Sequence, residues 1–291
     1  MDTRAEIREF LTSRRARLTP DAAGLPAYGG NRRVQGLRRE EVAMLAGVSV
    51  DYYTQLERGR LTGVSDTVLA SLGRALQLDE AEQAHLFDLA KAANDSPVAP
   101  RVRRTSDAVR TPIQRMLDAM TDAPAWVRND RFDLLAGNAL GRALYSPVFA
   151  MAGRINTARF AFLEPAARTF FRDWERTADD AVATLRSTAG RNPYDKRLTD
   201  LVGELSTRSE EFRRRWAAHD VRFHRTGLKR LHHPVVGELD LTYEALELPA
   251  DPGLLMFVYG AEPGTPSSDG LRLLASLSAT DRVAASSSPT D

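Results

Sequence analysis

Residues 36 to 59 read GLRREEVAMLAGVSVDYYTQLERG and carry the clearest structural pattern in the chain. Apolar residues recur at helical spacing in two short segments: Val42, Leu45 and Ala46, then Tyr53 and Leu56. Between the segments, Gly47-Val48-Ser49 supplies a turn glycine, an apolar residue and an N-cap serine. The pattern predicts a helix-turn-helix, a motif whose second helix fits the major groove of duplex DNA.

The outward positions of the second helix are candidates for reading bases. Gln55 can pair with adenine, and Asp51 can accept a hydrogen bond from a cytosine amine. Arginines at the ends of the motif would contact phosphates, which position a protein on DNA without specifying a sequence. For each residue alone, a solvated or helix-stabilising role stays open. The candidate DNA-binding residues are Arg38, Arg39, Ser49, Val50, Asp51, Tyr52, Thr54, Gln55, Arg58 and Arg60.

The pattern around the motif divides the chain into domains. Residues 1–94 are expected to form an all-α helix-turn-helix domain of five short helices, and residues 95–105, rich in proline and arginine, a linker. Residues 106–262 form a second domain in this scheme. Residues 263–291 form a tail, with a short helix at 271–277 and disorder beyond it. A loop precedes the motif, and its Asn31-Arg32-Arg33 is either a DNA-binding arm or solvated surface.

The second domain mixes strand and helix patterns. Strands are expected at residues 125–129, 132–136, 228–233, 235–247 and 254–259, and helices between 138 and 220. Two strands, several helices and three strands in that order predict an α+β domain, an antiparallel sheet capped by helices. Residues 238–243 alternate polar and apolar, as a strand with one solvated face does.

A sheet capped by helices can enclose a ligand between its layers. The candidate ligand-binding residues are Phe171, Trp174, Phe212, Trp216, His219 and Tyr243. Each aromatic residue can equally be core, and His219 can be a core histidine bonded to a carbonyl. One of His232 and His233 should point inward, but alternation does not decide which.

The composition limits which classes of protein function remain possible. Forty Lys and Arg against 39 Asp and Glu give a net charge of +1, so DNA binding must rest on local arginines. There is no cysteine, and no phosphate loop or nucleophile motif, so an enzyme is not expected. Four histidines between 219 and 233 leave a metal sensor as a minor alternative, although no helical His pair is present. With no apolar signal region and no run of about 20 apolar residues, a soluble cytoplasmic protein without a membrane partner is expected.

Residues 37–60, LRREEVAMLAGVSVDYYTQLERGR, resemble the xenobiotic-response-element class of helix-turn-helix regulators, and more narrowly the MmyB-like family. Residues 227–237 (GLKRLHHPVVG), 239–244 (LDLTYE) and 251–253 (DPG) support the same resemblance, which covers roughly residues 5 to 277. It implies a one-component transcription regulator with a PAS-like C-terminal domain. The suspected ligand class is a fatty acid or a similar small hydrophobic effector, with no other cofactor.

The expected partners follow from these readings. One recognition helix covers few base pairs, so a homodimer on a double-stranded DNA operator is expected. A different class also stays open, in which the protein is an antitoxin-like or scaffolding protein whose second domain binds another protein. Such a domain should expose an apolar patch, whereas a sensor should surround a cavity with its apolar residues.

Overall fold

The computed structural model describes residues 3–25, 34, 36–94, 108–217 and 226–286, and the side chains of residues 280–286 are outside that description. The chain forms two compact units. The first contains the described residues up to Asn94, together with 182–204 and 213–217. The second contains most of the remainder, including the whole sheet. The predicted linker and Asn31-Arg32-Arg33 lie outside the described residues.

The first unit opens with the five short helices that the sequence predicts. They are α1 (Thr3–Arg17), α2 (Arg39–Ala46), α3 (Val50–Glu57), α4 (Asp66–Ala75) and α5 (Glu80–Asn94). Their apolar faces share one core, with Phe10, Tyr53 and Leu72 each inaccessible to solvent. Leu45, expected to be buried, is only partly so, because Ala43 occupies the inward position on α2. Asp79 and Glu82 cap α5 reciprocally, each accepting from the other's backbone N–H.

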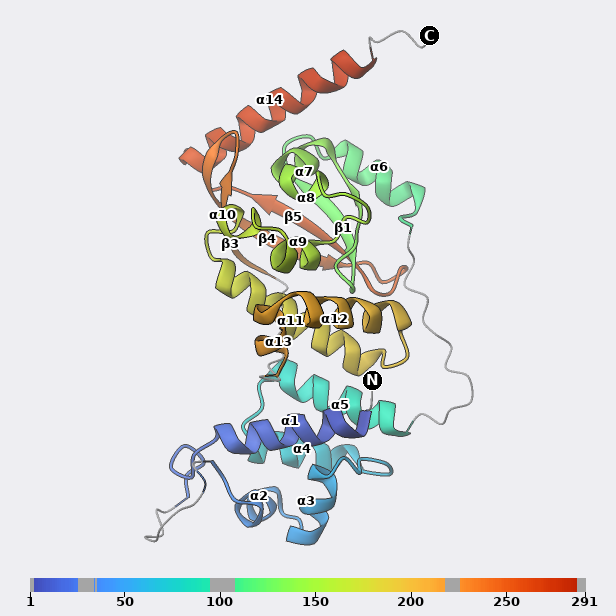
Figure 1. Cartoon of the computed structure of the whole chain (residues 1–291), viewed down its shortest axis with the longest axis vertical. Helices are drawn as coiled ribbons and strands as arrows, with labels where there is room; N and C mark the ends of the chain where they lie inside the picture. Colours follow the sequence, from blue (N-terminus) through green and yellow to red (C-terminus); the bar gives the residue numbers. More distant parts are fainter. Residues whose placement is uncertain (1–2, 26–33, 35, 95–107, 218–225, 287–291) are drawn as a thin grey trace. The chain divides into compact units, whose positions relative to one another are not determined.

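The second unit is built on a five-stranded antiparallel sheet in the order β2-β1-β5-β4-β3 (Figure 1). The strands are β1 (Ala125–Asn129), β2 (Leu134–Gly137), β3 (Thr226–His233), β4 (Gly237–Glu247) and β5 (Leu254–Gly260). β2 starts two residues later than predicted. Phe132 adopts a φ of 68° in the turn between β1 and β2, which an extended strand cannot contain.

The strand pairing assigns residues to the two faces of the sheet. Trp126 lies opposite Phe257, and Tyr243 lies opposite Tyr259, and all four rings belong to one core. Helices α7 (Ala139–Leu144), α8 (Ser146–Phe149), α9 (Thr157–Leu163) and α10 (Ala167–Phe170) contribute to that core, as does the start of α11 (Trp174–Arg191). We call this side the inner face. On the outer face, α6 (Thr111–Ala119) packs against β1, β2 and β5.

Three further helices complete the chain. They are α12 (Lys196–Arg208), α13 (Glu210–Ala217) and α14 (Pro266–Ser286). α14 is much longer than the helix predicted at 271–277. It packs on the sheet through Leu271 and Leu274, both buried in the core of the inner face. The prediction of disorder beyond 277 was therefore wrong as far as Ser286, and residues 287–291 lie outside the described part.

Candidate functional site

The turn of the helix-turn-helix has the geometry that its sequence predicts. Gly47 adopts a φ of 68°, a left-handed conformation that glycine reaches without steric cost. The Val48 N–H donates to the Ala43 carbonyl at 2.9 Å and closes the end of α2. The Ser49 hydroxyl accepts from the Tyr52 N–H at 3.1 Å and starts α3. The turn therefore fixes α3 against α2 and leaves its outward side free.

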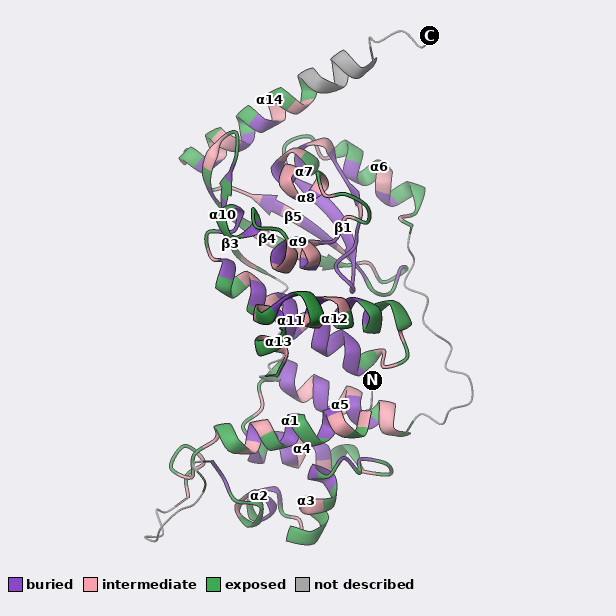
Figure 2. Cartoon of the chain, viewed as in Figure 1, coloured by how far each residue is buried: buried purple, intermediate pink, exposed green. Residues whose placement is uncertain are grey.

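The predicted DNA-binding residues lie on the exposed side of this motif (Figure 2). Thr54 alone among them is partly buried, and the rest are exposed: Arg38, Arg39, Ser49, Val50, Asp51, Tyr52, Gln55, Arg58 and Arg60. Val50 and Tyr52 are 45% and 38% exposed, which is unusual for large apolar side chains and consistent with a surface that meets a partner. The structure thus brings the base-reading candidates together on one helix face.

Arg39 also has a partner inside the motif. Arg39 forms an ion pair with Glu57, a carboxylate that is only 2% exposed and that also pairs with Arg15. The Tyr53 hydroxyl reaches the same carboxylate at 3.5 Å. Burial raises the pKa of Tyr53, and the charge of Glu57 adds to that effect. Arg39, predicted only as a phosphate contact, therefore also fastens α2 to α3.

Gln55, the strongest base-reading candidate, has its side chain already oriented. Arg60 donates to the Gln55 side-chain carbonyl oxygen at 3.3 Å. Its amide nitrogen has no hydrogen bond within the described residues. A glutamine that reads adenine needs both its donor and its acceptor, so the contact with Arg60 would have to open or be shared on DNA.

Four of the predicted ligand-binding residues belong to the second unit. Phe171 and Trp174 are buried in the core of the inner face, and the Trp174 indole donates to the Ala161 carbonyl at 2.8 Å. Phe212 is inaccessible and packs edge-on against Phe162 at 5.1 Å. Tyr243 is partly buried beside Phe257 and Tyr259 on the inner face.

Trp216 and His219 are the remaining two predicted ligand-binding residues. Trp216 belongs to the first unit, where the Arg186 guanidinium lies 4.3 Å from its ring and donates to its backbone carbonyl. Phe212, four positions earlier in the sequence, belongs to the second unit. His219 lies outside the described residues.

The exposure of the two histidines at the end of β3 shows which of them points inward. His232 is exposed, whereas His233 is 1% exposed, and its Nε2 lies 3.0 Å from the Ala143 carbonyl. Burial lowers the pKa of His233, partly offset by that hydrogen bond. The inward histidine thus has the partners of a structural residue. Within the described ranges, no group of three or more metal-ligating side chains could hold a metal ion.

The inner face also contains polar residues that the sequence analysis did not single out. Tyr145 and Tyr259 are buried with their hydroxyls 3.2 Å apart, and burial raises the pKa of both. Arg128 on β1 is 6% exposed, and Lys229 on β3 is partly buried. The sequence does contain a signal that Arg128 and Lys229 point inward. Arg128 falls two residues after Trp126, and Lys229 two before Leu231, so strand alternation places each charge on the side of an apolar neighbour.

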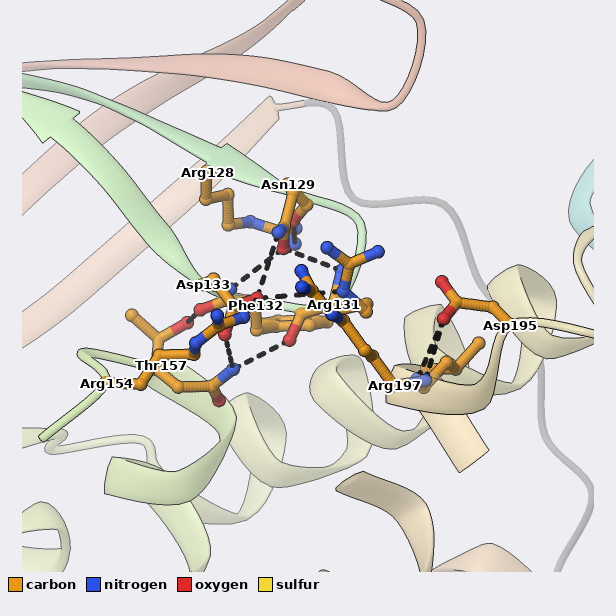
Figure 3. A network of polar contacts seen from close by, with 11 residues as sticks. Arg128, Asn129, Arg131, Phe132, Asp133, Arg154, Thr157, Asp195 and Arg197 are labelled. Carbon is orange, nitrogen blue, oxygen red and sulfur yellow. Dashed lines mark hydrogen bonds and ion pairs between the residues drawn. The ribbon is translucent and has the colours of Figure 1, made fainter. Parts of the chain in front are cut away.

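The turn that follows Arg128 is held by a polar network (Figure 3). Asn129 accepts from the backbone N–H groups of Arg131 and Asp133, each at 3.0 Å. The Asp133 carboxylate in turn accepts from Asn156 at 2.9 Å and from Arg154 at 3.2 Å. These contacts fix Phe132 at the tip of the turn, with its ring 3.9 Å from the Arg128 guanidinium carbon.

The geometry defines a class of protein, a helix-turn-helix domain joined to an α+β domain with a helix-covered sheet. Residues 6–86 match the helix-turn-helix domain family, and residues 109–274 match the MmyB-like transcription regulator ligand binding domain. The chain belongs to the MmyB-like family of transcription regulators. No curated protein gives a significant match.

The family fixes the general function. A DNA-binding domain and a regulator ligand-binding domain on one chain make it a ligand-sensing transcription regulator, and both families are regulatory rather than enzymatic. Among the described helices, none has the length and apolar character needed to cross a bilayer.

Proposed function

We propose that the protein binds a DNA operator as a homodimer and that a small hydrophobic ligand, with fatty acids as the class, changes its DNA affinity. The observation that carries the proposal is the exposed face of α3, which presents Val50, Tyr52 and Gln55 beside arginines. A dimer follows because one such helix reads too few base pairs for useful specificity. The hydrophobic ligand is supported by the family and by the aromatic inner face.

Helix α11 is the natural route for coupling, because one continuous helix contributes to both units. In the second unit, Thr177 on this helix accepts from the Lys229 ammonium at 2.7 Å. In the first unit, Arg186 on the same helix is fully buried and pairs with Glu6 of α1. A ligand that shifts the start of α11 would thereby alter the support of the helix-turn-helix domain.

The test is native mass spectrometry of the purified full chain, first under gentle and then under denaturing conditions. We expect a dimer that carries an additional mass of a fatty acid or similar lipid, released on denaturation. An empty dimer that also fails to take up added lipid would contradict the ligand class and favour a protein partner. A monomer at micromolar concentration, with or without operator DNA, would contradict the dimer.

A further inference from the structure

The end of α3 turns back on itself and places Arg60 beside Gln55. Gly59 adopts a φ of 89°, and its N–H donates to the Leu56 carbonyl at 2.9 Å. The Arg60 N–H donates to the Gln55 carbonyl at 3.1 Å. These two bonds define a Schellman motif, in which a left-handed glycine ends the helix and brings the next residue back over its last turn. The position of Arg60 is therefore set by the backbone at the end of the helix.

The packing of Gly59 against α1 holds this turn in place. Gly59 is buried, and a Cβ added to it would lie 2.4 Å from the backbone oxygen of Arg4. The Arg4 side chain also donates to the Arg58 carbonyl at 3.4 Å. A positive φ and a backbone neighbour at this distance are both accepted by glycine alone. The turn that carries Arg60 is therefore anchored on a neighbouring helix of the same unit.

The side chains of Gln55 and Arg60 are joined as well. An Arg60 N–H donates to the Gln55 side-chain oxygen at 3.3 Å. A guanidinium has five N–H donors and no acceptor, so only the oxygen of the Gln55 amide can face it. This fixes which way the amide points, with its NH2 group turned away from Arg60. Both side chains are exposed, and the NH2 group forms no hydrogen bond with a described residue.

Joined in this way, the two side chains offer hydrogen-bond donors and no acceptor. A glutamine on its own presents one donor and one acceptor, which match the N7 acceptor and the N6 amino donor of adenine. In the pair the Gln55 oxygen is occupied, so the groups that remain are its NH2 and the unused N–H groups of Arg60. In the major groove, guanine is the base that presents two acceptors, N7 and O6, and no donor.

We propose that Gln55 and Arg60 read guanine together and that Arg60 thereby sets the base specificity of α3. A charged donor beside the NH2 group favours the two guanine acceptors and disfavours the amino groups of adenine and cytosine. Guanine then replaces adenine as the partner of Gln55, and Arg60 contacts a base rather than only phosphate. This inference rests on the proposed function, because it names the base that the operator presents to α3.

The first test identifies the base directly. Duplexes are selected from a random pool with the full-length wild type and with full-length Gln55→Ala. The position whose preference is lost in Gln55→Ala is the one that Gln55 reads, and we expect the wild type to select guanine there. Any other base at that position overturns the proposal, and so does the absence of a position that depends on Gln55.

The second test removes the partner of Gln55. Fluorescence anisotropy compares the dissociation constants of the selected duplex and of one with adenine in place of that guanine in each half-site. The wild type should prefer the guanine duplex by at least about tenfold. Arg60→Leu frees the Gln55 oxygen, so we expect its preference to fall below about twofold or to reverse toward adenine. Arg60→Lys keeps a cationic donor and should retain part of the preference for guanine.

Arg58→Leu is the matched control for the loss of a positive charge. Arg58 is also exposed, and its side chain forms no hydrogen bond with a described residue. Its replacement should weaken binding to the guanine and adenine duplexes by the same factor and leave the wild-type preference intact. If Arg60→Leu behaves in the same way, Arg60 contacts only phosphate and the proposal is overturned.

The outcomes separate this inference from the proposed function. A wild type that selects an operator with adenine at the Gln55 position overturns the reading of guanine and leaves operator binding standing. A wild type that enriches no sequence overturns both. Circular dichroism of each variant verifies that it is folded, and the wild-type selection still decides the base if Arg60→Leu does not fold.

Discussion

Glu57 is 2% exposed at the end of α3 and accepts from Arg15 and Arg39, which lie on different elements. Removing its charge leaves the partly buried Arg15 without a counter-ion. We expect Glu57→Gln to lower the free energy of unfolding by about 3 kcal/mol, since breaking a buried ion pair is strongly destabilising. The measurement is urea unfolding followed by circular dichroism.

The matched control for that prediction is Glu40→Gln. Glu40 also pairs with an arginine, Arg38, at 3.4 Å, but its side chain is 62% exposed. Its loss should change the free energy of unfolding by no more than about 0.5 kcal/mol. Equal effects of the two substitutions would show that Glu57 does not hold α2 and α3 together.

The lowered pKa of Lys229 leads to a prediction of how the stability of the fold depends on pH. Burial lowers its pKa to about 8, below the 10.5 of an exposed lysine, so the folded state disfavours its charged form. Between pH 8 and 10 the unfolded chain binds more protons at this site, and the contribution of Lys229 to stability therefore rises with pH. We expect Lys229→Met to be more stable than the wild type at pH 7.5, with the difference narrowing toward pH 10.

Thermal unfolding of both proteins at pH 7.5, 8.5 and 9.5 would measure that difference. A constant gap across the range would mean that Lys229 titrates normally. A less stable Lys229→Met at pH 7.5 would mean that the ammonium is favourably paired in the folded state.

Single residues also mark what the sequence can and cannot predict. Gly47 and Ser49 were predictable, because a left-handed turn and an N-cap each demand particular residue types. The additional role of Arg39 was not, because its partner Glu57 lies 18 positions away and only the packing of α3 on α2 brings them together. Arg128 shows a third case, in which alternation signals an inward charge but cannot reveal that the rings of Phe132 and Phe257 lie over it.

At the scale of elements, α3 should read the operator through Gln55. We expect Gln55→Ala to weaken binding to the specific operator by about 1–3 kcal/mol and to change non-specific binding little. The measurement is fluorescence anisotropy with an operator and with a scrambled duplex of equal length. An equal loss on both duplexes would remove the base-reading role.

Arg58 provides the matched comparison on the same surface. It is exposed one residue beyond α3 and forms no ion pair with a described residue. If it contacts phosphate, Arg58→Gln should weaken operator and scrambled duplex alike and reduce the slope of log K against log salt by about 1. An unchanged slope would argue that Arg58 does not touch the backbone.

Elements whose apolar residues recur with a regular period could be predicted from the sequence. Elements whose extent depends on tertiary contacts could not. The alternation in 238–243 predicted β4, and its inward residues Leu239 and Leu241 are inaccessible to solvent. The true extent of α14 was hidden, because its serine-rich ends carry little apolar pattern, while Leu271 and Leu274 anchor it on the core. α11 was predicted as a helix, but its division between two units depends on Arg186 and Glu6, 180 positions apart.

At the scale of the whole molecule, the two units carry the two halves of one function. The family matches cover the helix-turn-helix at 6–86 and the ligand-binding domain at 109–274. The sequence predicted this pairing through its two motifs. It could not predict that residues 182–204 would belong with the N-terminal helices, since this depends on a buried ion pair between distant segments.

The central claim is that ligand and DNA binding are coupled, and coupling free energies in such proteins are typically about 1–3 kcal/mol. The most direct measurement selects operator DNA from a random pool with the full chain, then compares its dissociation constant for delipidated and dodecanoate-loaded protein. The account predicts at least about a fivefold difference, in either direction, that is absent on non-specific duplex. Identical operator affinity in a protein shown to be loaded would contradict it.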